Sequence, residues 1–132
     1  MSEKKILVAD DESHIRNVVS LKLTNAGFRV ITAADGQEAL EMAGAEMPDL
    51  LITDYHMPRL SGIELCRRLK QDPRTQAIPA IMLTARGYHL EAQDPSDHGI
   101  LEMMSKPFSP RHLLATVNQV LERGSSGASV AA

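Results

Sequence analysis

Short apolar runs alternate along the chain with stretches of helical length, and this alternation predicts the elements of the fold. Five runs rich in Ile, Val and Leu have the length of buried strands, and most of the stretches between them carry apolar residues at the spacing of an amphipathic helix. Strands and helices that alternate in this way are typical of βαβ units. The pattern therefore predicts a doubly wound α/β fold built on a five-stranded parallel sheet.

Turn and capping residues between the runs give the expected boundaries. Strands are expected at about 5–9, 28–33, 50–54, 80–84 and 101–105. Helices are expected from the first strand to just before Gly27, and at about 36–45, 61–70 and 110–123. The segment 86–99 has few periodic apolar residues and contains Gly87 and Asp94-Pro95, so it predicts a long loop with only a short, irregular fourth helix near Pro95.

Length and composition limit the number of domains and the cellular setting. The 132 residues, 43% of them hydrophobic, predict one domain over residues 1–123, and the small residues of 124–132 predict a flexible tail or linker. A formal net charge of −3 shows no basic excess that would indicate direct nucleic-acid binding. A single cysteine and the lack of an apolar stretch of about 20 residues predict a cytoplasmic protein that does not span a membrane.

Polar residues lie at the ends of four predicted strands. Asp10 and Asp11 follow the first strand, Asp54 ends the third, Thr84 ends the fourth and Lys106 follows the fifth. These side chains should converge, because the carboxyl ends of parallel strands meet at one edge of the sheet. Three carboxylates repel one another, and a hard cation such as Mg²⁺ relieves that repulsion. With the Lys106 ammonium and the Thr84 hydroxyl placed to bind phosphoryl oxygens, an oxygen of Asp54 is left as a candidate nucleophile.

The arrangement resembles the receiver domain of two-component response regulators over about residues 4–122. The residues that carry the resemblance stand in the family's order and approximate spacing: Asp10-Asp11, Asp54 followed by Met57-Pro58 and Gly62, Thr84-Ala85, and Lys106-Pro107-Phe108. The resemblance implies a flavodoxin-like (βα)5 fold with strand order 2-1-3-4-5. It also implies a cis peptide bond between Lys106 and Pro107.

The resemblance further implies a function and a role for each site residue. Asp54 would be the phosphoacceptor, and Thr84 and Lys106 would bind the phosphoryl oxygens. The implied ligands of Mg²⁺ are Asp11, Asp54 and the backbone carbonyl of His56, with Asp10 acting through water. The protein would then be a signalling switch that takes a phosphoryl group from a sensor histidine kinase or a phosphotransfer protein and alters a partner-binding surface. Such a switch is a regulatory phosphoacceptor rather than an enzyme, since it catalyses only its own phosphoryl transfer and dephosphorylation.

Other interpretations of these residues stay open. The family usually has an aromatic residue three positions before the lysine, and this chain has Met103 there. A receiver-like module that docks a partner constitutively, without a working phospho-switch, is therefore the main alternative. A phosphohydrolase of the haloacid dehalogenase type is a remote alternative, because that class requires a second aspartate at the position that His56 occupies here. Asp10 and Asp11 could also serve simply as caps of the first helix.

Overall fold

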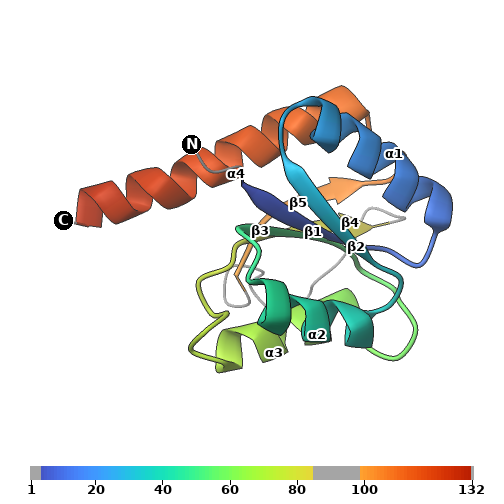
Figure 1. The fold of residues 1–132 in the computed structure, drawn as a ribbon, viewed down its shortest axis with the longest axis horizontal. Coiled ribbons are helices and arrows are strands. Elements are labelled where there is room, and N and C mark those ends of the chain that lie inside the picture. The colour runs from blue at the N-terminus through green and yellow to red at the C-terminus, as the bar shows by residue number, and fades with distance from the viewer. Residues whose placement is uncertain (1–3, 85–98, 132) are drawn as a thin grey trace.

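The computed structural model describes residues 4–84 and 99–131, with side chains described as far as Arg123. The strands of this part of the chain are β1 (Lys5–Ala9), β2 (Arg29–Ala33), β3 (Leu50–Asp54), β4 (Ala80–Thr84) and β5 (Ile100–Ser105) (Figure 1). The helices are α1 (Ser13–Asn25), α2 (Gly36–Glu46), α3 (Gly62–Gln71) and α4 (Pro110–Ala131). The strand positions expected from the sequence are confirmed to within one residue. None of the described helices is both long and apolar enough to cross a membrane.

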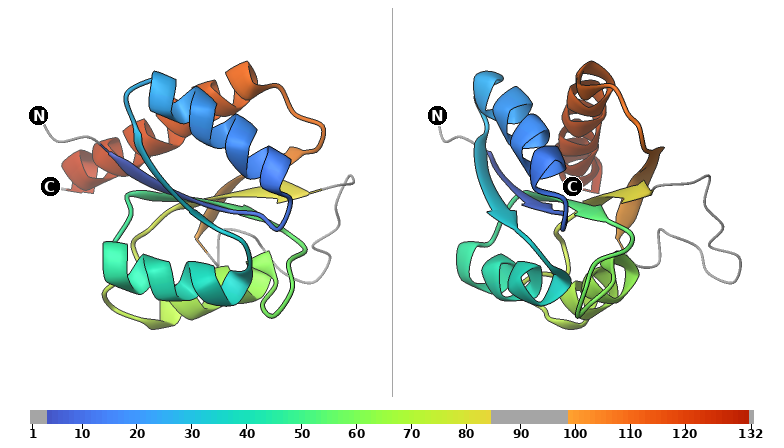
Figure 2. Two further views of the ribbon diagram at one scale, coloured as in Figure 1. Left: turned by 45° about the vertical axis from the view of Figure 1, so that its right-hand side comes forward. Right: turned by 90° about the vertical axis from the view of Figure 1, so that its right-hand side faces the viewer.

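The five strands form one parallel sheet in the order β2-β1-β3-β4-β5. Helices α1 and α4 cover one face of the sheet, and α2 and α3 cover the other (Figure 2). Every residue of β3 and β4 is buried, which explains why these strands appear in the sequence as continuous apolar runs. The predicted doubly wound α/β fold and its strand order are therefore confirmed.

β1 and β3 contribute side chains to two apolar cores, one on each face of the sheet. Leu7 of β1 and Leu51 of β3 are register partners and belong to the core on the α2 and α3 side. Ile6 and Ile52 belong to the core on the α1 and α4 side. Burial of each such side chain contributes about 1.5–3 kcal/mol. The two cores thus fix β1 and β3 side by side, and with them the loops at their carboxyl ends.

The last helix is longer than the sequence analysis predicts. Its start agrees, because the Ser109 hydroxyl accepts a hydrogen bond from the His112 N–H at 3.3 Å. Its end differs, because α4 continues to Ala131 instead of ending near Arg123 (Figure 1). A glycine within a helix costs only about 1 kcal/mol relative to alanine, so Gly124 alone does not stop the helix. The division into a domain over 1–123 and a tail over 124–132 stays a prediction.

The short helix predicted near Pro95 lies outside the described residues.

Helix α3 begins in direct contact with the end of β3. The N–H of Gly62 donates to the carbonyl of Tyr55 at 2.9 Å, and the Ser61 hydroxyl caps the helix by accepting from the Glu64 N–H at 3.2 Å. A Cβ atom on Gly62 would lie 2.2 Å from the backbone oxygen of Asp54. Only glycine allows the helix to approach the strand end this closely.

Replacing Gly62 by alanine should therefore disturb the fold where it supports Asp54. We expect Gly62→Ala to lower the free energy of unfolding by about 1–3 kcal/mol, as overpacking does elsewhere. Gly44→Ala in α2 is the matched control, since a Cβ there would meet only the end of the Arg74 side chain, at 3.5 Å. The control should be neutral or stabilising by up to about 1 kcal/mol. Urea unfolding measures both, and equal shifts in the two variants would contradict the steric account.

Candidate functional site

Three aspartates meet at the carboxyl edge of the sheet. Asp10 follows β1 directly, Asp11 is next to it, and Asp54 is the last residue of β3. Their carboxylate oxygens lie within 4.8 Å of one another. Asp10 is fully buried and Asp54 is 7% exposed, whereas Asp11 faces solvent. The convergence predicted from strand ends is therefore confirmed for all three carboxylates.

Lys106 supplies the opposing charge at this edge. Its ammonium lies 2.9 Å from a carboxylate oxygen of Asp10, 2.9 Å from one of Glu12 and 3.4 Å from one of Asp54. Lys106 follows β5, and its peptide bond to Pro107 is cis, as the resemblance implies. One cation thus bridges the loops that follow β1, β3 and β5.

The electrostatics of the cluster follow from its burial. Burial raises the pKa of Asp54 to about 6, and the neighbouring carboxylate of Asp10 adds to that rise. The Lys106 ammonium and the Tyr55 N–H, which donates to Asp54 at 2.9 Å, oppose it. Burial also disfavours a charged Lys106, but the carboxylates of Asp10 and Glu12 outweigh this and raise the pKa of Lys106 above its ordinary value. At neutral pH the lysine is a permanent cation, and Asp54 is mainly a carboxylate.

Thr84 and His56, the other predicted site residues, differ in burial. Thr84 is buried at the end of β4, where its carbonyl accepts a hydrogen bond from the Lys106 N–H at 2.6 Å. His56 is exposed two residues after β3, and its ring centroid lies 4.7 Å from that of Tyr55. The roles predicted for the Thr84 hydroxyl and the His56 carbonyl stay predictions.

Met103 is the residue that raised the alternative of a docking module without a phospho-switch. Met103 in β5 is partly buried and packs against the core on the α2 and α3 side. Its register partner is Met82 of β4, two residues before Thr84. Met103 therefore packs where β4 and β5 approach their carboxyl ends.

Sequence reasoning missed Glu12. This residue lies next to the acidic pair, but its contact with Lys106 joins positions 94 residues apart. A third consecutive acidic residue after β1 was the only signal available, and consecutive charges more often belong to a solvated turn. Position in the fold, rather than residue type, reveals the contact.

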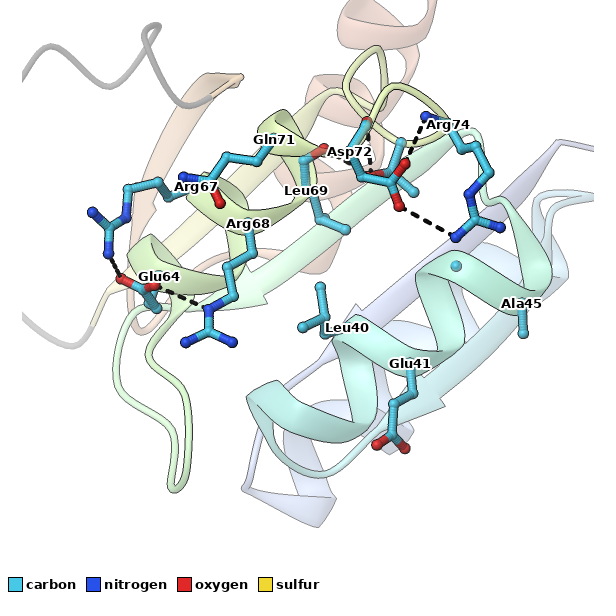
Figure 3. Close-up of a pocket in the computed structure, with 12 residues that line it drawn as sticks. Leu40, Glu41, Ala45, Glu64, Arg67, Arg68, Leu69, Gln71, Asp72 and Arg74 are labelled. Atoms are coloured by element: carbon cyan, nitrogen blue, oxygen red, sulfur yellow. Dashed lines mark hydrogen bonds and ion pairs between the residues drawn. The ribbon is translucent and has the colours of Figure 1, made fainter.

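A surface pocket of about 750 Å³ lies between α2 and α3 (Figure 3). Leu40, Leu69 and several arginines line the pocket. Arg68 pairs with Glu64 at 3.0 Å, so at least part of this charge is neutralised within the chain. The carboxylates that converge at the sheet edge are not among the residues that line the pocket.

The donor atoms at the edge of the sheet suit a hard cation. Carboxylate oxygens are the ligands that Mg²⁺ and Ca²⁺ take, and two of the three here are nearly buried, where mutual repulsion is strongest. The residues present therefore fit a divalent cation held by Asp10, Asp11 and Asp54.

Comparison with known proteins identifies the family. Residues 6–118 match the family described as the response regulator receiver domain. The chain belongs to this family of two-component receiver domains. Chemotaxis response regulator CheY4 of Vibrio cholerae is similar in structure, with a TM-score of 0.83 and 35% identity over 90% of this chain and 99% of that one.

Longer regulators are similar in sequence. The alkaline phosphatase synthesis transcriptional regulatory protein PhoP of Bacillus subtilis is 42% identical over 91% of this chain and 49% of that protein. The phosphate regulon transcriptional regulatory protein PhoB of Pseudomonas aeruginosa is 41% identical over 99% of this chain and 57% of that protein. The chain thus spans about half the length of the curated relatives it matches.

The raised pKa of Asp54 predicts how the metal-free protein responds to pH. The folded state binds the Asp54 proton more tightly than the unfolded chain does, because the pKa of Asp54 is about 6 against an ordinary value of 3.8. The contribution of Asp54 to stability therefore falls as pH rises from about 4 to about 6. Asp54→Asn removes this penalty. In the presence of a chelator, we expect the variant to melt above the wild type at pH 7 and close to it at pH 4.

Asp72→Asn is the matched control for this measurement. Hydrogen bonds from the Arg74 backbone and side chain lower the pKa of Asp72, so its charge favours folding. The control should be neutral or slightly destabilising at pH 7. Thermal unfolding at both pH values tests the pair, and an Asp54→Asn protein less stable than the wild type at pH 7 would contradict the repulsion described here.

Proposed function

We propose that this receiver domain is a phosphorylation-dependent switch in which Asp54 accepts a phosphoryl group from a phosphohistidine of a sensor histidine kinase or phosphotransfer protein. The observation that carries the proposal is the meeting of Asp10, Asp11, Asp54 and Lys106 at one edge of the sheet. Membership of the receiver family supports it. We further propose that the domain acts in the cytoplasm.

The chemistry proposed for Asp54 is an in-line displacement at phosphorus. A carboxylate oxygen of Asp54 forms the new P–O bond while the P–N bond of the phosphohistidine breaks. The bonding electron pair stays on the imidazole nitrogen. A later attack by water breaks the P–O bond, releases inorganic phosphate and restores the carboxylate. The domain thus catalyses only the gain and loss of its own phosphoryl group.

The proposed cofactor is Mg²⁺, held by Asp10, Asp11, Asp54 and the backbone carbonyl of His56. Bound there, it would supply positive charge to the phosphoryl oxygens and relieve the repulsion among the aspartates. Of the three carboxylates Asp11 is the exposed one, so the site is open to solvent on that side. The chain's own contribution is to hold the carboxylates at a fixed spacing on buried strand ends.

Lys106 and Thr84 are proposed to bind the phosphoryl oxygens. Lys106 already faces Asp54 at 3.4 Å, and its backbone is tied to that of Thr84. An added phosphoryl group carries about −1.5 to −2 charges, so it would draw the ammonium away from its present carboxylates. Movement of Lys106 and Thr84 would shift the carboxyl ends of β5 and β4, and this is the proposed route to an altered partner-binding surface.

The output is proposed to lie outside the described fold, in a longer protein or a separate partner. The names of the PhoP and PhoB relatives describe transcriptional regulators about twice the length of the matched region, which supports control of an output function by this domain. Met103, at the position where the family usually has an aromatic residue, favours one alternative, a module that docks its partner without a phospho-switch.

Phosphorylation by a small donor tests the proposal. We expect wild-type protein incubated with acetyl phosphate and Mg²⁺ to gain the mass of one phosphoryl group, because the acidic site activates the donor without a kinase. The gain should disappear in Asp54→Asn and when Mg²⁺ is chelated. Intact-mass spectrometry at neutral pH measures the modified fraction.

Asp72→Asn again serves as the control, because it alters a partly exposed aspartate at the end of α3 and should be modified like the wild type. Wild-type protein that binds Mg²⁺ but gains no phosphoryl group would favour the docking-module alternative. Equal modification of Asp54→Asn would place the phosphoacceptor elsewhere.

A further inference from the structure

Glu12 lies at the start of α1, but its side chain does not cap the helix. It is the N-cap residue of α1. Ser, Thr, Asp and Asn are the residues preferred there, because their short side chains reach the free N–H groups of the first turn. The Glu12 carboxylate instead lies 2.9 Å from the ammonium of Lys106.

Neighbouring residues hold the start of α1 without help from the Glu12 side chain. A carboxylate oxygen of Asp10 accepts a hydrogen bond from the Glu12 N–H at 2.9 Å. The Arg16 guanidinium donates to the Asp10 carbonyl at 2.7 Å. These bonds fix the backbone of Glu12, so its side chain projects from a defined point toward Lys106.

The carboxylates around Lys106 fall into two kinds. Asp10 and Asp54 belong to the group of side chains placed to hold a cation, and Glu12 does not. A cation bound by that group would repel the ammonium and share its carboxylate partners. Glu12 would then be the partner that Lys106 keeps.

We propose that Glu12 is a positioning residue that competes with the phosphoryl group for Lys106. This inference rests on the proposed function of Asp54. In the unphosphorylated protein Glu12 holds the ammonium at the rim of the site. On phosphorylation Lys106 must leave Glu12 to reach a phosphoryl oxygen, so Glu12 weakens the phosphorylated state relative to the unphosphorylated one.

The size of the effect follows from where the contact lies. The Glu12 side chain is 49% exposed, whereas that of Lys106 is 13% exposed. Water therefore screens the pair from one side, and the glutamate can turn into solvent once the lysine leaves. Loss of an ion pair of this kind changes a binding equilibrium constant by about two- to fivefold.

Binding of beryllofluoride, a phosphoryl analogue, tests the proposal in the presence of saturating Mg²⁺. We expect Glu12→Gln to bind beryllofluoride about two- to fivefold more tightly than the wild type in isothermal titration calorimetry. A gain in affinity is informative, since a variant that merely damages the site would lose affinity. Thermal unfolding of the metal-free variant should show that the fold is retained, because no cap is lost.

Asp35→Asn is the matched control for charge. Asp35 follows β2 at the same edge of the sheet. Its side chain accepts a hydrogen bond from the Glu38 N–H at 2.8 Å and lies 3.7 Å from the Arg59 side chain. Asparagine preserves the helix cap while removing one negative charge. The control should keep wild-type affinity for beryllofluoride.

The outcomes separate this proposal from the one it rests on. Unchanged or weaker binding by Glu12→Gln, with normal binding by the wild type, would overturn the role of Glu12 alone. An equal gain in Asp35→Asn would also overturn it, because general charge would then explain the effect. Wild-type protein that does not bind beryllofluoride with Mg²⁺ would overturn the proposed function and this inference together.

Discussion

The ion pairing of one lysine with carboxylates from distant parts of the chain is the interaction on which the site depends. The parallel sheet forces Asp10 and Asp54 together, with both side chains buried, and two buried like charges there oppose folding. Lys106 offsets this opposition and joins the loops that follow three strands. The site therefore combines repulsion between Asp10 and Asp54 with the attraction of both to Lys106, and a change of charge at Asp54 would alter both.

The surrounding structure bears on the movement proposed for Lys106. β3 and β4 are buried along their whole length and do not yield easily. The close approach of Gly62 to the Asp54 carbonyl fixes the strand end from the α3 side. The backbone hydrogen bond between Lys106 and Thr84 couples the loop after β5 to β4. A charge added at Asp54 would thus act on the β4 and β5 end of the sheet.

The sequence predicted the parts of this structure that arise from local pattern. Buried strands are short apolar runs, and one topological rule brings Asp10, Asp54 and Lys106 to one edge. Contacts that depend on side-chain reach were not predictable, and Glu12 is the clearest case, because its partner lies 94 residues away. The end of α4 was also missed, since a glycine weakens a helix without setting where it stops. The roles of Thr84 and the His56 carbonyl still rest on family resemblance.

The most direct test of the account is to identify the residue that carries the phosphoryl group. Borohydride reduces an aspartyl phosphate to homoserine, which peptide mass spectrometry can locate in the chain. Protein treated with acetyl phosphate and Mg²⁺ and then reduced should contain homoserine at position 54. Homoserine at position 10 or 11, or none in protein that has gained a phosphoryl group, would contradict the assignment of Asp54 as the phosphoacceptor.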